Sequence, residues 1–140
     1  MEFDELSGRV IGCAIEAHRT LGPGLLESVY KRCMEHELTV CGLQFESEKS
    51  VEVWYKGSKL DCPNLRVDLI VGGILLIELK VVERLLPVHE AQLLSYLRLG
   101  NFRAGLLINF HAARLKDGIK RMVNLFPEAS GFSVTSATSG

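Results

Sequence analysis

The feature that most constrains the fold is a pair of short apolar runs separated by two glycines. Residues 65–71 and 74–80 flank Gly72-Gly73, and each run has apolar side chains at both odd and even positions. Because side chains alternate between the two faces of a strand, such runs are typical of strands covered on both faces. The two glycines predict a tight reversal. We therefore expect two neighbouring antiparallel strands inside a sheet.

Breaking residues and hydrophobic periods place the other elements. Helices are expected over residues 4–20, from Pro23 or Gly24 to Val40, over 87–99 and over 115–126. Further strands are expected over residues 50–55 and 104–110. The first three strands would pair as an antiparallel meander, and the helix between the third and fourth strands would cross over to a parallel fourth strand. The predicted fold class is α/β, a mixed β-sheet sandwiched by α-helices.

Length and charge narrow the class of protein. The 140 residues suit one domain, expected over residues 1–128, and the Ser/Thr/Gly/Ala-rich residues 129–140 are expected to form a flexible C-terminal tail. Lys and Arg number 16 against 17 Asp and Glu, which excludes a basic arm or an acidic tail. The sequence has no apolar run of membrane-span length and no signal-like start. We therefore expect a cytoplasmic protein without a membrane partner.

The four cysteines are Cys13, Cys33, Cys41 and Cys62, and no two of them form a C-x-x-C pair. This spacing lacks the usual zinc or redox signature. We expect buried, reduced thiols. A cluster ligated by all four stays open, without a local motif to support it.

Charged residues inside the apolar runs are the candidate site residues. Asp68 interrupts the first run, and Glu78 and Lys80 interrupt the second. A buried charge is costly unless it is paired or bound to a metal ion. Glu78 and Lys80 are two residues apart and therefore share one face of their strand.

The turn at Gly72-Gly73 decides whether Asp68 shares that face. A two-residue turn would place Asp68 on the opposite face. A three-residue loop over residues 71–73 would place it opposite Leu76 and diagonal to Glu78, about 7–8 Å away between backbones. We predict the three-residue loop or an equivalent bulge, with both carboxylates near enough to share one cation.

Two carboxylates and a lysine on one face suit metal-dependent hydrolysis. Mg²⁺ or Mn²⁺ prefers oxygen ligands, lowers the pKa of a bound water and neutralises charge developing on a phosphate. Lys80 would orient that water or stabilise the pentavalent phosphate. The alternative is an ion pair of Lys80 with Glu78 or Asp68 on an edge strand.

The order of these residues resembles the signature of the PD-(D/E)XK nuclease superfamily, with Asp68 followed ten residues later by Glu78-Leu79-Lys80. Gln92 to Tyr96 resembles the Q-x-x-x-Y motif of RecB-like members. Residues 24–30, Gly-Leu-Leu-Glu-Ser-Val-Tyr, match the motif that names the GxxExxY proteins. The resemblance covers about residues 5–126. Val67 stands where the superfamily name has proline.

The resemblance implies a restriction-endonuclease-like core and a role for each matched residue. The implied metal ligands are Asp68, Glu78 and Glu27. The implied catalytic residues are Lys80, Glu27, Gln92 and Tyr96. Of these, Gln92 and Tyr96 would line the site, where they would contact nucleic acid or hold Lys80.

We therefore expect a Mg²⁺- or Mn²⁺-dependent phosphodiesterase that acts on nucleic acid, in the first place DNA. The alternative is a non-catalytic nucleic-acid-binding or protein-interaction module that keeps the fold. The balanced charge and the short chain favour a partner or a homodimer. His18 continues the apolar stripe of the first helix and is expected in the core. Trp54 could stack on a base, but packing in the core or at a sheet edge is the favoured interpretation.

Overall fold

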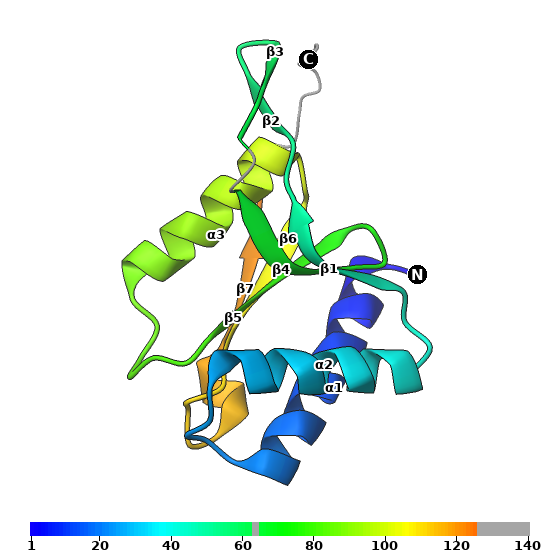
Figure 1. Cartoon of the computed structure of the whole chain (residues 1–140), viewed down its shortest axis with the longest axis vertical. Coiled ribbons are helices and arrows are strands. Elements are labelled where there is room, and N and C mark those ends of the chain that lie inside the picture. The colour runs from blue at the N-terminus through cyan, green and yellow to red at the C-terminus, as the bar shows by residue number, and fades with distance from the viewer. Residues whose placement is uncertain (63–64, 126–140) are drawn as a thin grey trace.

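The computed structural model describes residues 1–62 and 65–125 (Figure 1). Its helices are α1 (Phe3–Leu21), α2 (Glu27–Val40), α3 (Pro87–Gly100) and the short 3₁₀ helix η1 (Leu115–Gly118). Its main sheet contains β1 (Phe45–Ser50), β4 (Arg66–Val71), β5 (Leu75–Lys80), β6 (Ala104–Asn109) and β7 (Ile119–Val123). A separate hairpin contains β2 (Val53–Tyr55) and β3 (Ser58–Leu60).

The main sheet is mixed, in the order β1-β4-β5-β6-β7. β1, β4 and β5 pair antiparallel, and α3 crosses over so that β6 pairs parallel with β5. β7 adds an antiparallel edge strand beside β6. The predicted α/β class is confirmed, with an antiparallel meander and a parallel fourth strand in a restriction-endonuclease-like core.

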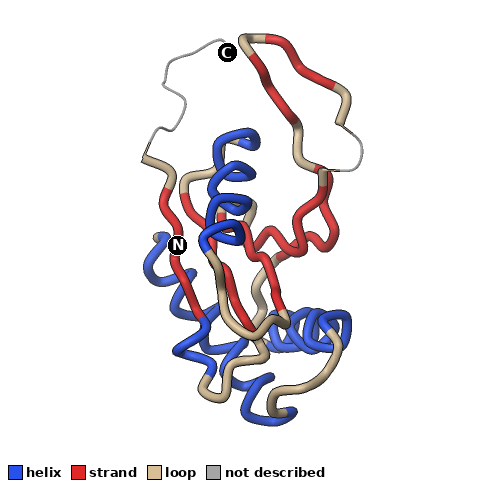
Figure 2. The backbone as a smooth tube through the Cα atoms, turned by 90° about the vertical axis from the view of Figure 1, so that its left-hand side faces the viewer, coloured by secondary structure: helices blue, strands red, loops and turns tan. Residues whose placement is uncertain are grey.

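Helices cover both faces of the sheet and create two cores (Figures 1 and 2). On one face, Tyr30 of α2 is fully buried and stacks on Phe110, with 4.6 Å between ring centroids. On the other face, Leu93 and Leu97 of α3 pack with Leu76 of β5. Each fully buried leucine of this kind contributes about 1.5–3 kcal/mol. The β5 strand is covered from both sides, as its sequence predicts.

The predicted helix over residues 115–126 is wrong. The chain forms one turn of η1 and then the edge strand β7. Gly118 is the last residue of η1 and lies so close to β6 that an added Cβ would lie 2.7 Å from the carbonyl oxygen of Asn109. Pairing of Ile119 with Ile108 then continues the sheet. Tertiary pairing has overridden a spacing that also suits a helix.

The predicted first strand, residues 50–55, is also corrected. The first strand of the meander is β1, which ends at Ser50, and residues 53–55 belong to the separate hairpin. β1 is polar and mostly exposed, so its sequence carries no alternation to reveal it. Lys56 and Gly57 form the turn between β2 and β3. Both residues have positive φ, 50° and 82°, as a two-residue hairpin turn requires.

Among the described residues, no helix is long and apolar enough to cross a membrane.

Cys13 is buried and Cys33 is half-buried, but Cys41 and Cys62 are exposed, so the expectation of four buried thiols is wrong for two of them. The Sγ atoms of Cys13 and Cys41 are 3.5 Å apart. The tail predicted over residues 129–140 lies outside the described residues.

Candidate functional site

The turn between β4 and β5 sets the relative position of the two strand carboxylates. The strands pair Val71 with Leu75 and Leu69 with Ile77, so the loop consists of Gly72, Gly73 and Ile74. The predicted three-residue loop is confirmed in length, but it starts one residue later than expected. Gly72 and Gly73 have φ of 62° and 74°, which favours glycine. As a result, Asp68 lies directly across from Glu78 instead of diagonal to it.

At Asp68 and Glu78, side-chain oxygens hold the two strands together. The backbone N–H of Asp68 donates to Oε1 of Glu78 at 2.8 Å. The backbone N–H of Leu79 donates to Oδ2 of Asp68, also at 2.8 Å. Each carboxylate is therefore fixed by the main chain of the opposite strand, which restricts both to one geometry.

The sheet bends where Asp68 lies. Val67 packs in the core under α3, whereas Leu69 packs in the core under α1 and α2. Residues two apart in a regular strand share a face, so β4 turns over between them. Across from Asp68 in β1, Glu48 has φ of 51°, an uncommon value for a residue other than glycine. Such backbone conformations concentrate at functional sites.

Burial and like charge disfavour ionisation of these acids. Burial, followed by the nearby Asp68 carboxylate, raises the pKa of Glu78 to about 8. Burial also raises the pKa of Asp68, against the opposing effects of the Leu79 N–H and of Lys31. The pKa of Glu27 is raised by burial first and by Asp68 second. A bound cation would favour the ionised form of these acids and offset this cost.

Lys80 connects this acidic group to α3. It lies two residues after Glu78 on the same face of β5, and its Nζ is 3.3 Å from Oε1 of Gln92. The Nε2 of Gln92 donates to the hydroxyl of Tyr96 at 3.2 Å. Burial and the Glu78 charge raise the pKa of that hydroxyl. Three of the residues singled out from the sequence thus form one chain of contacts.

Glu27 reaches the same region from α2, of which it is the first residue. The predicted start at Pro23 or Gly24 is too early. The Tyr30 hydroxyl donates to the carbonyl of Gly22 and accepts from the N–H of Leu25, which ties down the segment before the helix. This buried tyrosine therefore fixes where Glu27 enters the site.

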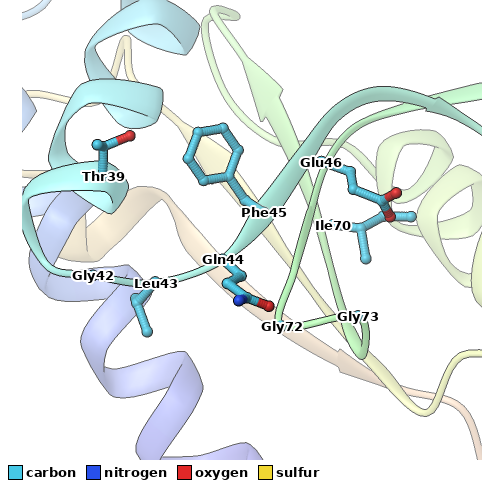
Figure 3. A pocket seen from close by; sticks show the side chains of 9 residues that line it. All are labelled: Thr39, Gly42, Leu43, Gln44, Phe45, Glu46, Ile70, Gly72 and Gly73. Carbon is cyan, nitrogen blue, oxygen red and sulfur yellow. The ribbon is translucent and has the colours of Figure 1, made fainter.

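A hollow of about 580 Å³ opens between α2, β1 and β4 at this point. It is lined by Glu27, Ser28, Lys31, Arg32, Glu35, Ser47, Glu48 and Asp68. A larger hollow of about 660 Å³ lies beyond the end of α2, where the chain enters β1 and where β4 turns into β5 (Figure 3). Its lining includes one carboxylate, Glu46, and none of the predicted site residues. Of these two hollows, only the smaller is lined by predicted site residues, Glu27 and Asp68.

Six of the eight residues that line the smaller hollow were not predicted as site residues, and Lys31 and Glu48 are a close ion pair among them. The Nζ of Lys31 is 2.7 Å from Oε2 of Glu48 and 3.5 Å from Oε2 of Glu35. Lys31 lies one helical turn after Glu27, a spacing that could have pointed to it. Glu48 gave no signal, because β1 itself is not visible in the sequence. His18 is buried as expected, with Nε2 2.8 Å from the carbonyl oxygen of Ala112.

The donor chemistry fits a hard divalent cation. Asp68 and Glu78 each use one carboxylate oxygen for a backbone N–H and have a second oxygen with which to bind a cation. Within residues 1–62 and 65–125, no group of three or more His, Cys, Asp and Glu side chains is arranged to hold a metal ion. The role of Glu27 as a third ligand stays a prediction.

Comparison with known proteins gives one family. A model described as the PD-(D/E)XK nuclease superfamily matches residues 4–122. No curated protein and no solved structure matches the chain with significance. The match does not test the narrower resemblance to the GxxExxY proteins, which stays a prediction.

Proposed function

The chain belongs to the PD-(D/E)XK nuclease superfamily, and on this premise we propose that it is a Mg²⁺- or Mn²⁺-dependent nuclease that hydrolyses phosphodiester bonds in DNA. The observation that carries the proposal is the pair Asp68 and Glu78, each held by the backbone of the other's strand, with Lys80 on the same face. Glu78 is buried and Asp68 is half-buried, and two neighbouring carboxylates at such positions are costly unless a cation binds to them. Such an arrangement is typical of a functional site.

Asp68 and Glu78 would hold the metal ion, and Glu27 would complete the acidic group. When bound, such an ion lowers the pKa of a water molecule and neutralises charge that develops on the phosphate. The two backbone N–H bonds keep both carboxylates oriented without help from the ion. Little reorganisation is then needed when substrate arrives.

Lys80 would act on the reacting phosphate. In hydrolysis a water oxygen bonds to phosphorus while the bond from phosphorus to the leaving sugar oxygen breaks. The Lys80 ammonium would donate a hydrogen bond to a non-bridging oxygen or to the attacking water, and its positive charge would stabilise the pentavalent state. Gln92 would hold that ammonium in place, and Tyr96 would hold Gln92.

The proposal is tested by cleavage of labelled DNA and RNA with Mg²⁺ or Mn²⁺. We expect the wild type to cut DNA, and Asp68→Asn, Glu78→Gln and Lys80→Met each to lower the rate about 100-fold or more. Lys120→Met changes an exposed lysine on β7 and serves as the matched control. The proposal fails if the wild type cuts neither nucleic acid, or if cleavage survives both Glu78→Ala and Lys80→Ala.

The alternative is a non-catalytic nucleic-acid-binding or protein-interaction module. Calorimetry separates the two. Mn²⁺ binding that is lost in Asp68→Asn supports the enzyme, whereas nucleic-acid binding without any Mn²⁺ binding supports the module. A homodimer and a cytoplasmic location stay predictions, and sedimentation of the full chain tests the first.

A further inference from the structure

The β2–β3 hairpin stands apart from the main sheet. Its two strands pair only with each other among the described strands. Figures 1 and 2 show it projecting at one end of the molecule, past the end of α3. Its root is anchored, because Val53 is buried and Val51 packs against Gly100, the last residue of α3. Beyond this root the hairpin faces solvent.

Two adjacent aromatic side chains are exposed on this projection. Trp54 is 49% exposed and Tyr55 is 56% exposed. As neighbours in a strand they point to opposite faces of the hairpin, which therefore presents a ring on each side. Exposed aromatic rings on a projecting element are accessible for contacts with a partner.

Each ring has a lysine beside it. Lys59 is the direct partner of Trp54 in the hairpin, and the Nζ of Lys56 lies 5.4 Å from the centroid of the Tyr55 ring. The Nζ of Lys59 is also 3.0 Å from Oε2 of Glu52, so part of its charge is balanced. Aromatic rings next to cations are the combination with which proteins bind single-stranded nucleic acid, through base stacking and phosphate contacts.

The hairpin continues the two strands that meet at the candidate site. The chain runs from β1 into the hairpin and returns into β4, and the N–H of Val51 donates to the carbonyl of Leu65 at its root. Asp68 is three residues beyond Leu65, and Trp54 is three residues beyond Val51. At about 3.3 Å per residue and about 5 Å across the two paired strands, the path between them is at most about 25 Å. A nucleic acid spans this distance with about seven stacked nucleotides.

We propose that the β2–β3 hairpin binds unpaired nucleotides, with Trp54 and Tyr55 stacking on bases and Lys56 and Lys59 beside the phosphates. Unpaired nucleotides are required because bases inside a duplex are already stacked on both sides and offer no free ring face. The inference rests on the proposed nuclease function and names its substrate class, DNA with a single-stranded segment.

The chain carries a built-in probe, because Trp54 is its only tryptophan. The full-length protein is titrated with a single-stranded oligonucleotide in EDTA, so that no cleavage takes place. We expect the Trp54 emission to be quenched as the oligonucleotide binds. A blunt duplex of the same sequence should bind more weakly and quench less.

Variants are compared by the anisotropy of a labelled oligonucleotide. Trp54→Ala and Tyr55→Ala are each expected to weaken single-strand binding by about 5- to 100-fold, the effect of losing one stacked base. Trp54→Phe, which keeps a ring, should retain most of the affinity. Val40→Ala, at an exposed position where α2 ends, is the matched control and should leave it unchanged.

The hairpin proposal is overturned if the oligonucleotide binds without quenching Trp54, if the two alanine variants bind like the wild type, or if the duplex binds as tightly as the single strand. These results would leave Mg²⁺-dependent cleavage intact. Conversely, quenching by single strands together with no cleavage under any condition would overturn the nuclease and keep the hairpin as a nucleic-acid-binding surface. Quenching by a protein and by no nucleic acid would assign the surface to a protein partner and overturn the proposal.

Discussion

At the scale of single residues, Asp68 and Glu78 face each other from adjacent strands, and their repulsion adds to the cost of burying them. The N–H of Asp68 and the charge of Lys80 offset only part of this cost for Glu78. With a pKa of about 8, Glu78 is mostly protonated at neutral pH in the absence of a cation. A divalent ion would have to displace that proton, so metal binding should release protons at neutral pH.

The same pKa predicts how stability depends on pH. In the unfolded chain Glu78 ionises near its usual pKa of 4.5, whereas in the folded chain it ionises near 8. Between these values the unfolded state binds fewer protons, so the free energy of unfolding falls as pH rises from about 5 to 8. Without metal we expect a loss of the order of a few kcal/mol, followed by a plateau above pH 8.

Urea denaturation in EDTA at several pH values measures this trend. Glu78→Gln removes the titrating group and should flatten the curve over this range. Part of the slope should survive in the variant, because burial also raises the pKa of Asp68 and Glu27. Wild-type stability that rises from pH 5 to 8 would contradict the expectation.

Residues of the site were visible in the sequence to different degrees. Asp68, Glu78 and Lys80 stood out because charges are rare inside apolar strands. Glu48 was hidden, since its strand is a polar edge strand with nothing buried to give it a period. Its place across from Asp68 depends on the pairing of β1 with β4, two strands that are far apart in the sequence. A local sequence pattern does not encode such a pairing.

At the scale of elements, the central strands and α3 were predictable because both faces of the sheet are buried and Pro87 marks the start of the helix. The structure of residues 115–123 was not predictable in this way. In residues 115–123 the same apolar spacing suits an amphipathic helix or an edge strand. We attribute the formation of the edge strand to Gly118. This position lets the backbone approach β6 closely enough to continue the sheet.

Gly118→Ala tests that explanation. The added Cβ would lie 2.7 Å from the Asn109 carbonyl oxygen and 2.9 Å from the Cβ of Ala112, so β7 or its neighbours must shift. We expect a loss of about 1–3 kcal/mol in the free energy of unfolding, measured by urea denaturation. Gly12→Ala, inside α1 with open space around it, is the control. It should be stabilising by about 0.5–1 kcal/mol. Equal effects of the two changes would refute the role of Gly118.

At the scale of the whole molecule, 16 basic residues against 17 acidic ones leave no general attraction for nucleic acid. The candidate site itself gathers carboxylates from α2, β1, β4 and β5. Phosphate is repelled from such a surface unless a cation neutralises it. Any binding near the site should therefore depend on the divalent ion.

This electrostatic arrangement predicts metal-dependent affinity. In the Lys80→Met variant, which should not cleave, affinity for a labelled DNA is expected to rise at least about tenfold between EDTA and Mg²⁺. Anisotropy titrations at constant ionic strength measure it. The double variant Asp68→Asn, Lys80→Met is the control and should gain much less from Mg²⁺. An affinity that Mg²⁺ leaves unchanged in Lys80→Met would contradict the proposed site.

The backbone hydrogen bond from Val51 to Leu65 has a consequence for how this protein can diverge or be engineered. This hydrogen bond brings together the two ends of the segment that contains the hairpin, and among the described strands β2 and β3 share no sheet with the others. A short turn joining Val51 to Leu65 would therefore close the chain without changing the register of β1 against β4. We therefore expect that the exposed part of the hairpin beyond the buried Val53 can be lengthened or exchanged while the strands that carry Glu48 and Asp68 keep their alignment.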